Sequence, residues 1–173
     1  GTLASNEAAE TDTLTFTPIS PRPADEDSFV VPNDYVWNVV IRWGDPMTAD
    51  APEFDVMNQT RESQDVQFGF NCDYVGFFPL GPVTSRVARQ VGAGLAAGAG
   101  YAVEIDTDQA LLVVNHEYTN PIQMFPNYVP GNPTKNEVDV ELSAHGAAVV
   151  EIRRNAEGTW NYVQNSPFNR RIT

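Results

Sequence analysis

The chain has 173 residues, of which 42% are hydrophobic, and carries a formal net charge of -13 with a pI near 4.3. This length is enough for one sizeable core, and the hydrophobic content excludes an intrinsically disordered chain. The acidic balance excludes nucleic acid and anionic membrane surfaces as partners, because both carry phosphates that need a basic patch. The excess carboxylates suit either a divalent cation such as calcium or a solvated surface that keeps a secreted protein soluble.

Cys72 is the only cysteine of the chain. A single cysteine excludes an internal disulfide and a cysteine-only zinc site, and it leaves three roles for the thiol: a buried inert group, a nucleophile or a single metal ligand. No run of about 18 apolar residues is present, which excludes a membrane span by a helix. The first residue is Gly1 rather than Met, and no signal peptide is recognisable. We therefore expect a processed chain and do not infer a cytoplasmic location.

The first 34 residues are predicted to form an extended N-terminal arm, because Pro18, Pro21, Pro23 and Pro32 interrupt any helix or central strand. Residues 13–18 are a candidate edge strand within it. The β-branched and aromatic residues 35–43 predict a strand, and Gly44, Asp45 and Pro46 predict the turn that ends it.

Further strands are predicted along the rest of the chain. Residues 67–70 and 74–80 are typical of one or two strands, residues 110–114 of a buried strand, and the strictly alternating residues 138–142 of an exposed strand. Residues 147–153 and 159–163 predict a hairpin. A short helix is expected at residues 134–136, where Thr134 and Glu137 have the spacing of a capping box.

Strands outnumber helices, so the pattern favours a mainly β protein with antiparallel sheets, as a sandwich or as part of a β-propeller with long irregular loops. The glycine- and alanine-rich residues 92–100 lack the spacing of a nucleotide-binding loop and are interpreted as a surface insertion. Four large aromatic residues are assigned to the core rather than to a substrate platform: Trp37, Trp43, Phe77 and Phe78.

Two segments combine an apolar strand with a cluster of donor atoms. In residues 69–80 the donors are Cys72 and Asp73, and in residues 111–121 they are His116 and Glu117. A thiolate beside a carboxylate on an apolar element can hold a metal, because both ligands are anionic and the apolar wall limits competition from water.

Five stretches together resemble the PhoX-type bacterial alkaline phosphatases: residues 42–46, 67–80, 112–121, 124–126, and Trp160 with 166–173. The resemblance implies a β-propeller that hydrolyses phosphomonoesters with calcium and iron. It also implies export by the twin-arginine route to a periplasmic or extracellular location. Members of that family are larger than this chain. We therefore expect residues 35–173 to be the N-terminal portion of the propeller, inactive without the missing C-terminal portion of the same protein.

The resemblance also suggests roles for single residues. Cys72 is the expected iron ligand, and Glu117 the expected carboxylate ligand for calcium or a bridge to iron. Asp73 is a further candidate ligand, although neighbouring residues on a strand face opposite ways. Arg170 and Arg171 are candidates for binding the substrate phosphate, since a guanidinium matches phosphate oxygens; a charge pair at a strand end is the alternative.

Four other polar residues have open roles. His116 is either a structural histidine or a support for the ligands, and His145 is expected at the surface. Asn71 and Asn115 either orient ligands or hold loops through backbone bonds.

Two other functions remain open from the sequence. One is a non-catalytic, calcium-stabilised propeller or sandwich module that binds a partner. The other is a different propeller hydrolase, such as a lactonase. An iron–thiolate bond separates these possibilities, because neither alternative needs a cysteine.

Overall fold

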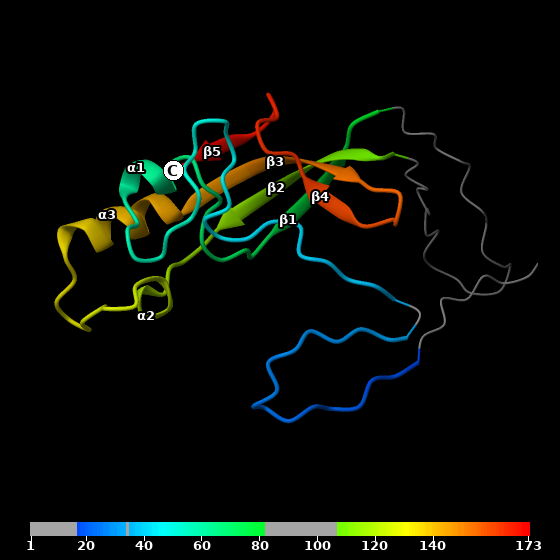
Figure 1. Ribbon diagram of the computed structural model, residues 1–173, viewed down its shortest axis with the longest axis horizontal. Helices are drawn as coiled ribbons and strands as arrows, with labels where there is room; N and C mark the ends of the chain where they lie inside the picture. Colours follow the sequence, from blue (N-terminus) through cyan, green and yellow to red (C-terminus); the bar gives the residue numbers. More distant parts are fainter. Residues whose placement is uncertain (1–16, 34, 82–106) are drawn as a thin grey trace, which may run out of the picture. The chain divides into compact units, whose positions relative to one another are not determined.

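The computed structural model describes residues 17–33, 35–81 and 107–173 (Figure 1). The chain divides into two units, Gly1–Asn38 and Val39–Thr173, whereas the sequence analysis ended the arm at residue 34. The described residues of the first unit form no helix or strand. The aromatic rings of Phe29 and Trp37 lie 5.0 Å apart there. The insertion at residues 92–100, and most of the candidate strand at 13–18, fall outside the described residues.

The second unit contains a five-stranded antiparallel sheet, which confirms a mainly β, antiparallel architecture. Its strands are β1 (Val75–Pro79), β2 (Gln109–His116), β3 (Gly146–Arg154), β4 (Trp160–Tyr162) and β5 (Arg170–Ile172). The strand order is β1-β2-β3-β4, and β5 also pairs with β3. The short strands β4 and β5 follow one another along the same edge of β3, pairing with opposite ends of it. Figure 1 shows β2 and β3 side by side through the sheet.

One face of the sheet carries the main core. Every second residue of β2 is buried or packed against buried residues, as in Leu112 and Val114, and Ala148 and Val150 of β3 lie on the same face. Met47 and Phe68, from the loops before β1, cover this face. The main core therefore packs the sheet against loop segments that belong to none of its strands.

Three helices accompany the sheet: α1 (Arg61–Gln64), α2 (Pro121–Met124) and α3 (Lys135–Ala144). A second core gathers Met124, Phe125, Val140 and Ala144 around α2 and α3, and Trp43, Phe70 and Tyr128 pack against it. Trp43 therefore packs at a core, as predicted, edge-on to both Phe54 and Phe70. None of the helices in the described part of the chain is long and apolar enough to cross a membrane.

The exposed strand predicted at residues 138–142 is wrong, because these residues belong to helix α3. The predicted capping box is present: Thr134 and Glu137 each accept from the other's backbone N–H. Helix formation buries Val140, Ser143 and Ala144, a spacing of three and four residues that matches one helical face. Val138 and Leu142 are exposed. The alternation of apolar residues in this stretch therefore does not correspond to one buried face of a strand.

The strand predicted at residues 35–43 is also wrong, because none of these residues joins a ladder. The turn after it is present: Asp45 N–H donates to the carbonyl of Arg42 at 3.0 Å. Gly44 has φ of 85°, and a Cβ there would overlap the Phe54 ring. Residues with a high strand propensity form a strand only where a neighbouring strand is available to pair with them. Here the chain turns at Gly44 and packs into the core.

Three of the four aromatic core assignments are wrong. Trp37 is 50% exposed, Phe77 is 40% exposed and Phe78 is 52% exposed. The two phenylalanines lie on β1, at an edge of the sheet, where no further strand among the described residues covers them. Phe77 packs edge-on against Trp160, with 5.5 Å between the ring centres.

The other strand predictions fare better. Strands β1 and β2 and the β3–β4 hairpin lie within a few residues of the predicted ranges. Residues 67–70 form only an isolated bridge between Gln67 and Pro46.

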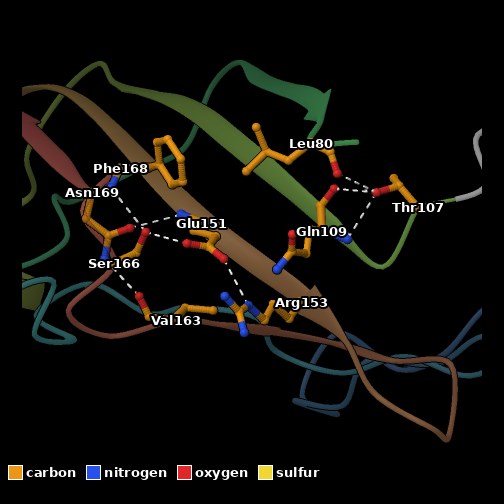
Figure 2. A network of polar contacts seen from close by, with 9 residues as sticks. All are labelled: Leu80, Thr107, Gln109, Glu151, Arg153, Val163, Ser166, Phe168 and Asn169. Atoms are coloured by element: carbon orange, nitrogen blue, oxygen red, sulfur yellow. Dashed lines mark hydrogen bonds and ion pairs between the residues drawn. The ribbon is translucent and has the colours of Figure 1, made fainter. Parts of the chain in front are cut away.

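The ends of strands β1 and β2 are connected next to the undescribed residues. The Thr107 hydroxyl contacts the carbonyls of Leu80 and Gln109 at 2.9 and 2.8 Å (Figure 2).

A buried polar network ties the C-terminal segment to β3 (Figure 2). The Ser166 hydroxyl donates to the carboxylate of Glu151, which also accepts from Arg153 Nε at 2.9 Å. Asn169 Oδ1 accepts from the Glu151 N–H at 2.9 Å, while its Nδ2 donates to the carbonyls of Met47 and Val163. The Ser166 bond lowers the pKa of the Glu151 carboxyl. These bonds set where β5 begins.

We predict that Ser166→Ala lowers the free energy of unfolding by about 2 kcal/mol, because a buried carboxylate loses its hydroxyl donor. The measurement is urea unfolding of the variant and of the wild type. Ser63→Ala is the matched control, since the Ser63 hydroxyl contacts only that of Thr60 at the surface. Equal destabilisation by the two substitutions would contradict a special role for Ser166.

Candidate metal centre

The candidate ligands lie at one end of the β1–β2 ladder. The ladder pairs Val75 with Val114, and the bond from Asn115 N–H to the carbonyl of Tyr74, at 3.2 Å, extends it by one residue. Continuing the same register places Cys72 across from Glu117. Two segments that are 45 residues apart in the chain, as Asn71 and His116 are, therefore meet at this end of the sheet.

Side chains of β2 hold the turn that contains Cys72 and Asp73. Asn115 Oδ1 accepts from the N–H of Tyr74 at 2.6 Å, and its Nδ2 lies 3.5 Å from Asp73 Oδ2. His116 Nδ1 bonds to the carbonyl of Asn71 at 3.0 Å. Asn71 itself has φ of 58°, in the left-handed region that asparagine tolerates better than most residues. Asn115 thus holds this loop, one of the two roles that the sequence left open, and Asn71 contributes the carbonyl that His116 engages.

The donor atoms at this end are accessible. Cys72 is exposed and free of any disulfide, and Asp73 and Glu117 are exposed as well. The Cys72 thiol is partly desolvated, which raises its pKa above the usual value; a bound metal ion reverses that effect by stabilising the thiolate.

The donor set is chemically suitable but incomplete. Thiolate sulfur suits iron, and carboxylate oxygens suit calcium. No group of three or more His, Cys, Asp or Glu side chains that could hold a metal ion is present within residues 17–33, 35–81 and 107–173. These residues therefore fit one side of a metal centre, and other ligands have to close it.

His116 is buried beside the turn, with 2% of its surface exposed. Because a carbonyl only accepts, Nδ1 must carry the proton in the bond to Asn71. Burial lowers the His116 pKa to about 4, so the ring is neutral at physiological pH. Its Nε2 has no hydrogen-bond partner in the described part of the chain. His145, expected at the surface, is half-buried and bonds to the carbonyl of Glu141 at 2.7 Å.

The two candidate phosphate-binding arginines have different surroundings. Arg171 donates to the carbonyls of Ala147, Ser143 and His145, at 2.8, 2.5 and 2.9 Å, and so satisfies the end of helix α3. Burial lowers the Arg171 pKa to about 10. Arg170 is exposed, and within the described residues its side chain donates to two carbonyls of its own segment, those of Pro167 and Asn169.

The register places the two arginines on opposite faces of the sheet. Arg170 lies opposite Val149 and, through it, in line with Val113, on the face that carries Asn115 two residues later. Arg171 lies opposite Ala148, on the core face. Only Arg170 therefore shares a face with the residues that lead to Glu117.

The sequence analysis missed residues that support the turn without bearing any reactive group. Gly69 is one of them: a Cβ at this position would lie 2.5 Å from the His116 ring and 2.6 Å from the carbonyl oxygen of Ala144. Asn169 is another, through its three bonds to separate segments. Gly69 itself was the only sign in the sequence that a side chain is excluded at this position. The group that excludes it, the His116 ring, comes from strand β2.

Comparisons with known proteins identify the family of this chain. The family model for alkaline phosphatase PhoX matches residues 14–173. A solved structure, PhoX of Pseudomonas fluorescens in complex with vanadate, a transition state analogue, is similar with a TM-score of 0.62 and 32% sequence identity. The match covers 83% of this chain and 20% of that chain. No curated protein matched. The motifs that lead into the candidate metal centre and the match over most of the chain agree, and the chain belongs to the PhoX alkaline phosphatase family.

Proposed function

We propose that this chain supplies one side of the active site of a phosphomonoesterase, an alkaline phosphatase of the PhoX type. The observation that carries the proposal is the β1–β2 register, whose continuation places Cys72 across from Glu117, in a chain that belongs to this family. The chain spans 20% of the length of the similar PhoX structure. The activity therefore belongs to a longer protein, and residues 1–173 alone would be inactive.

Iron and calcium are the metals that the donor atoms favour. Cys72 would hold iron through its thiolate, while Glu117 and Asp73 would offer carboxylate oxygens to calcium or as a bridge. When bound, such ions supply positive charge that polarises the phosphoryl oxygens of a phosphomonoester. The protein's own part is to present these donors from a fixed turn and a strand end.

Arg170 is the better candidate for binding the substrate phosphate. It is exposed, and it lies on the face of the sheet that leads to Glu117. The Arg171 guanidinium already donates to three carbonyls. We therefore assign Arg170 to the substrate and Arg171 to the end of helix α3.

The rest of the same polypeptide is the proposed partner of this sheet. The β1 edge exposes Val75, Phe77 and Phe78, and an open apolar edge requires cover by further chain. Completion of a β-propeller by the remaining residues would provide that cover and the missing ligands. Export to the periplasm or the extracellular space, by the twin-arginine route, accords with the excess of acidic residues, which keeps a secreted protein soluble.

We predict that Cys72→Ser in the full-length protein removes both iron and phosphatase activity. A thiolate bound to ferric iron gives a charge-transfer colour, which the substitution should bleach because a serine hydroxyl is a poor iron ligand. The measurements are the visible spectrum, metal analysis and hydrolysis of p-nitrophenyl phosphate. A colourless and fully active wild type would remove iron from the proposal and favour another hydrolase or a binding module.

We predict that Glu117→Gln weakens the response to calcium. Removal of calcium by a chelator should lower the activity and the melting temperature of the wild type together, because a ligand of the folded state stabilises it by mass action. The variant should show a smaller change in both. Glu157→Gln is the matched control, an exposed acid in the turn between β3 and β4, and it should behave as the wild type. A normal calcium response in Glu117→Gln would exclude this ligand.

We predict that substitution of Arg170 lowers catalytic efficiency, whereas substitution of Arg171 lowers stability. Arg170→Ala should lower kcat/KM roughly tenfold to a hundredfold, the loss of a charge-assisted bond to phosphate, with little change in melting temperature. Arg171→Ala should cost about 3 kcal/mol of folding free energy, because buried carbonyls lose their donors. Steady-state kinetics and thermal unfolding measure the two effects. An unchanged kcat/KM in Arg170→Ala would exclude Arg170 from substrate binding.

A further inference from the structure

We propose that Asn115 and His116 are positioning residues for the metal centre: they hold the chain on both sides of Cys72 and Asp73 and so fix where these two side chains point. The inference rests on the proposed function, because the direction of Cys72 matters only if a metal centre is built there. Neither residue needs to touch the metal ions or the substrate.

The two residues bind the turn at its two ends. Asn115 accepts from the N–H of Tyr74 through its side chain and donates to the carbonyl of Tyr74 through its backbone. His116 donates to the carbonyl of Asn71. Only Cys72 and Asp73 lie between the two attachment points. Because both ends are fixed, the segment has few conformations left to lose when a metal binds.

The turn requires such support because its backbone is unfavourable. Asn71 adopts φ of 58°, a left-handed conformation that is less favourable than the extended or right-handed one even for asparagine. The carbonyl of this same residue is the one that His116 holds. The bond therefore stabilises the conformation that sends the chain from Asn71 toward Cys72.

His116 is itself held rigidly by the core. Its ring packs edge-on against Phe68, with 4.7 Å between ring centres. On another side the backbone of Gly69 lies so close that a side chain there would overlap the ring. The next residue, Phe70, donates its N–H to the carbonyl of Ala144 at 3.1 Å. Residues 69–71 thus run between the imidazole and the end of helix α3, and the position of Asn71 follows that of the core.

Asn115 acts on the carboxylate as well as on the backbone. Its Nδ2 lies 3.5 Å from Asp73 Oδ2, so the amide restrains the Asp73 side chain while Oδ1 holds Tyr74. Asn115 and His116 are neighbours on β2 and face opposite sides of the sheet. The turn is consequently held from both sides, and Glu117, the next residue of the chain, is placed by the same strand end.

The test uses the full-length protein and two pairs of variants. His116→Leu and Asn115→Leu remove the bonds to the turn. His116→Asn keeps an N–H donor near the position of Nδ1, and Asn115→Asp keeps the acceptor for Tyr74. Hydrogen–deuterium exchange of the peptide covering residues 70–75, in metal-stripped protein, reports on the turn. Titration with iron, followed by metal analysis and the visible spectrum, reports on the site.

Faster exchange of this peptide and a tenfold to hundredfold weaker iron affinity are expected for the two leucine variants, in line with the usual effect of losing a group that orients a ligand. His116→Asn should recover most of both properties, whereas Asn115→Asp, which keeps the acceptor for Tyr74 but loses the amide donor beside Asp73, should recover the slow exchange. A general loss of stability would instead raise exchange across the whole sheet, so peptides from β3 are the internal control. If His116→Leu does not fold, Asn115→Leu, at a half-buried position, carries the same comparison.

Two results would overturn the inference. One is normal iron affinity in leucine variants whose turn exchanges faster, which would leave the metal centre in place but deny any positioning role. The other is unchanged exchange in those variants, which would show that the bonds do not hold the turn. Failure of the proposed function looks different: the wild type then binds no iron and Cys72→Ser is fully active, whatever the exchange data show.

Discussion

Strand β2 is the element on which the rest of the second unit depends. It pairs with β3 over all eight of its residues and with β1 over five, and its inward side chains form the centre of the main core. A strand held on both edges and on one face has little freedom to shift its register, because a slip of one residue would turn its apolar side chains outward. The last two residues of β2, Asn115 and His116, and the next residue, Glu117, are therefore held in a fixed position.

Much of the second unit is irregular chain, and side-chain bonds to backbone replace the missing ladders. Gln64 accepts from the Trp43 indole and donates to the carbonyl of Phe68. Asn169 joins β3 to two loops, and Gln59 donates to the carbonyl of Met124 at 2.6 Å. Backbone groups that leave water need such partners. Buried and half-buried polar side chains of this unit therefore connect loops to one another, to the helices and, through Asn169, to the sheet.

The candidate metal centre combines a rigid support with an open set of ligands. The turn before β1 is fixed by the core through His116 and by the strand through Asn115, whereas Cys72, Asp73 and Glu117 themselves are exposed. Such an arrangement suits a centre that is completed by another part of the protein, because the pre-formed side needs no rearrangement when the other ligands arrive.

Elements with local signals could be predicted from the residues alone. Apolar runs gave β1 and β2, turn residues gave the β3–β4 hairpin, and the capping box marked the start of α3. The motifs around Cys72 and Glu117 also sufficed to identify the family, which the comparisons confirm. Each of these features depends on residues that are close together in the chain.

Features that depend on distant neighbours became apparent from the folded chain. Residues 138–142 alternate as a strand would, yet they form a helix because a core around Met124 accepts its buried face. Arg170 and Arg171 are chemically alike, and it is the end of α3 that engages one and leaves the other exposed. The role of His116 likewise arises from a carbonyl that lies 45 residues away in the chain. Burial and hydrogen-bond partners are properties of the packed chain, and no local pattern of residues specifies them.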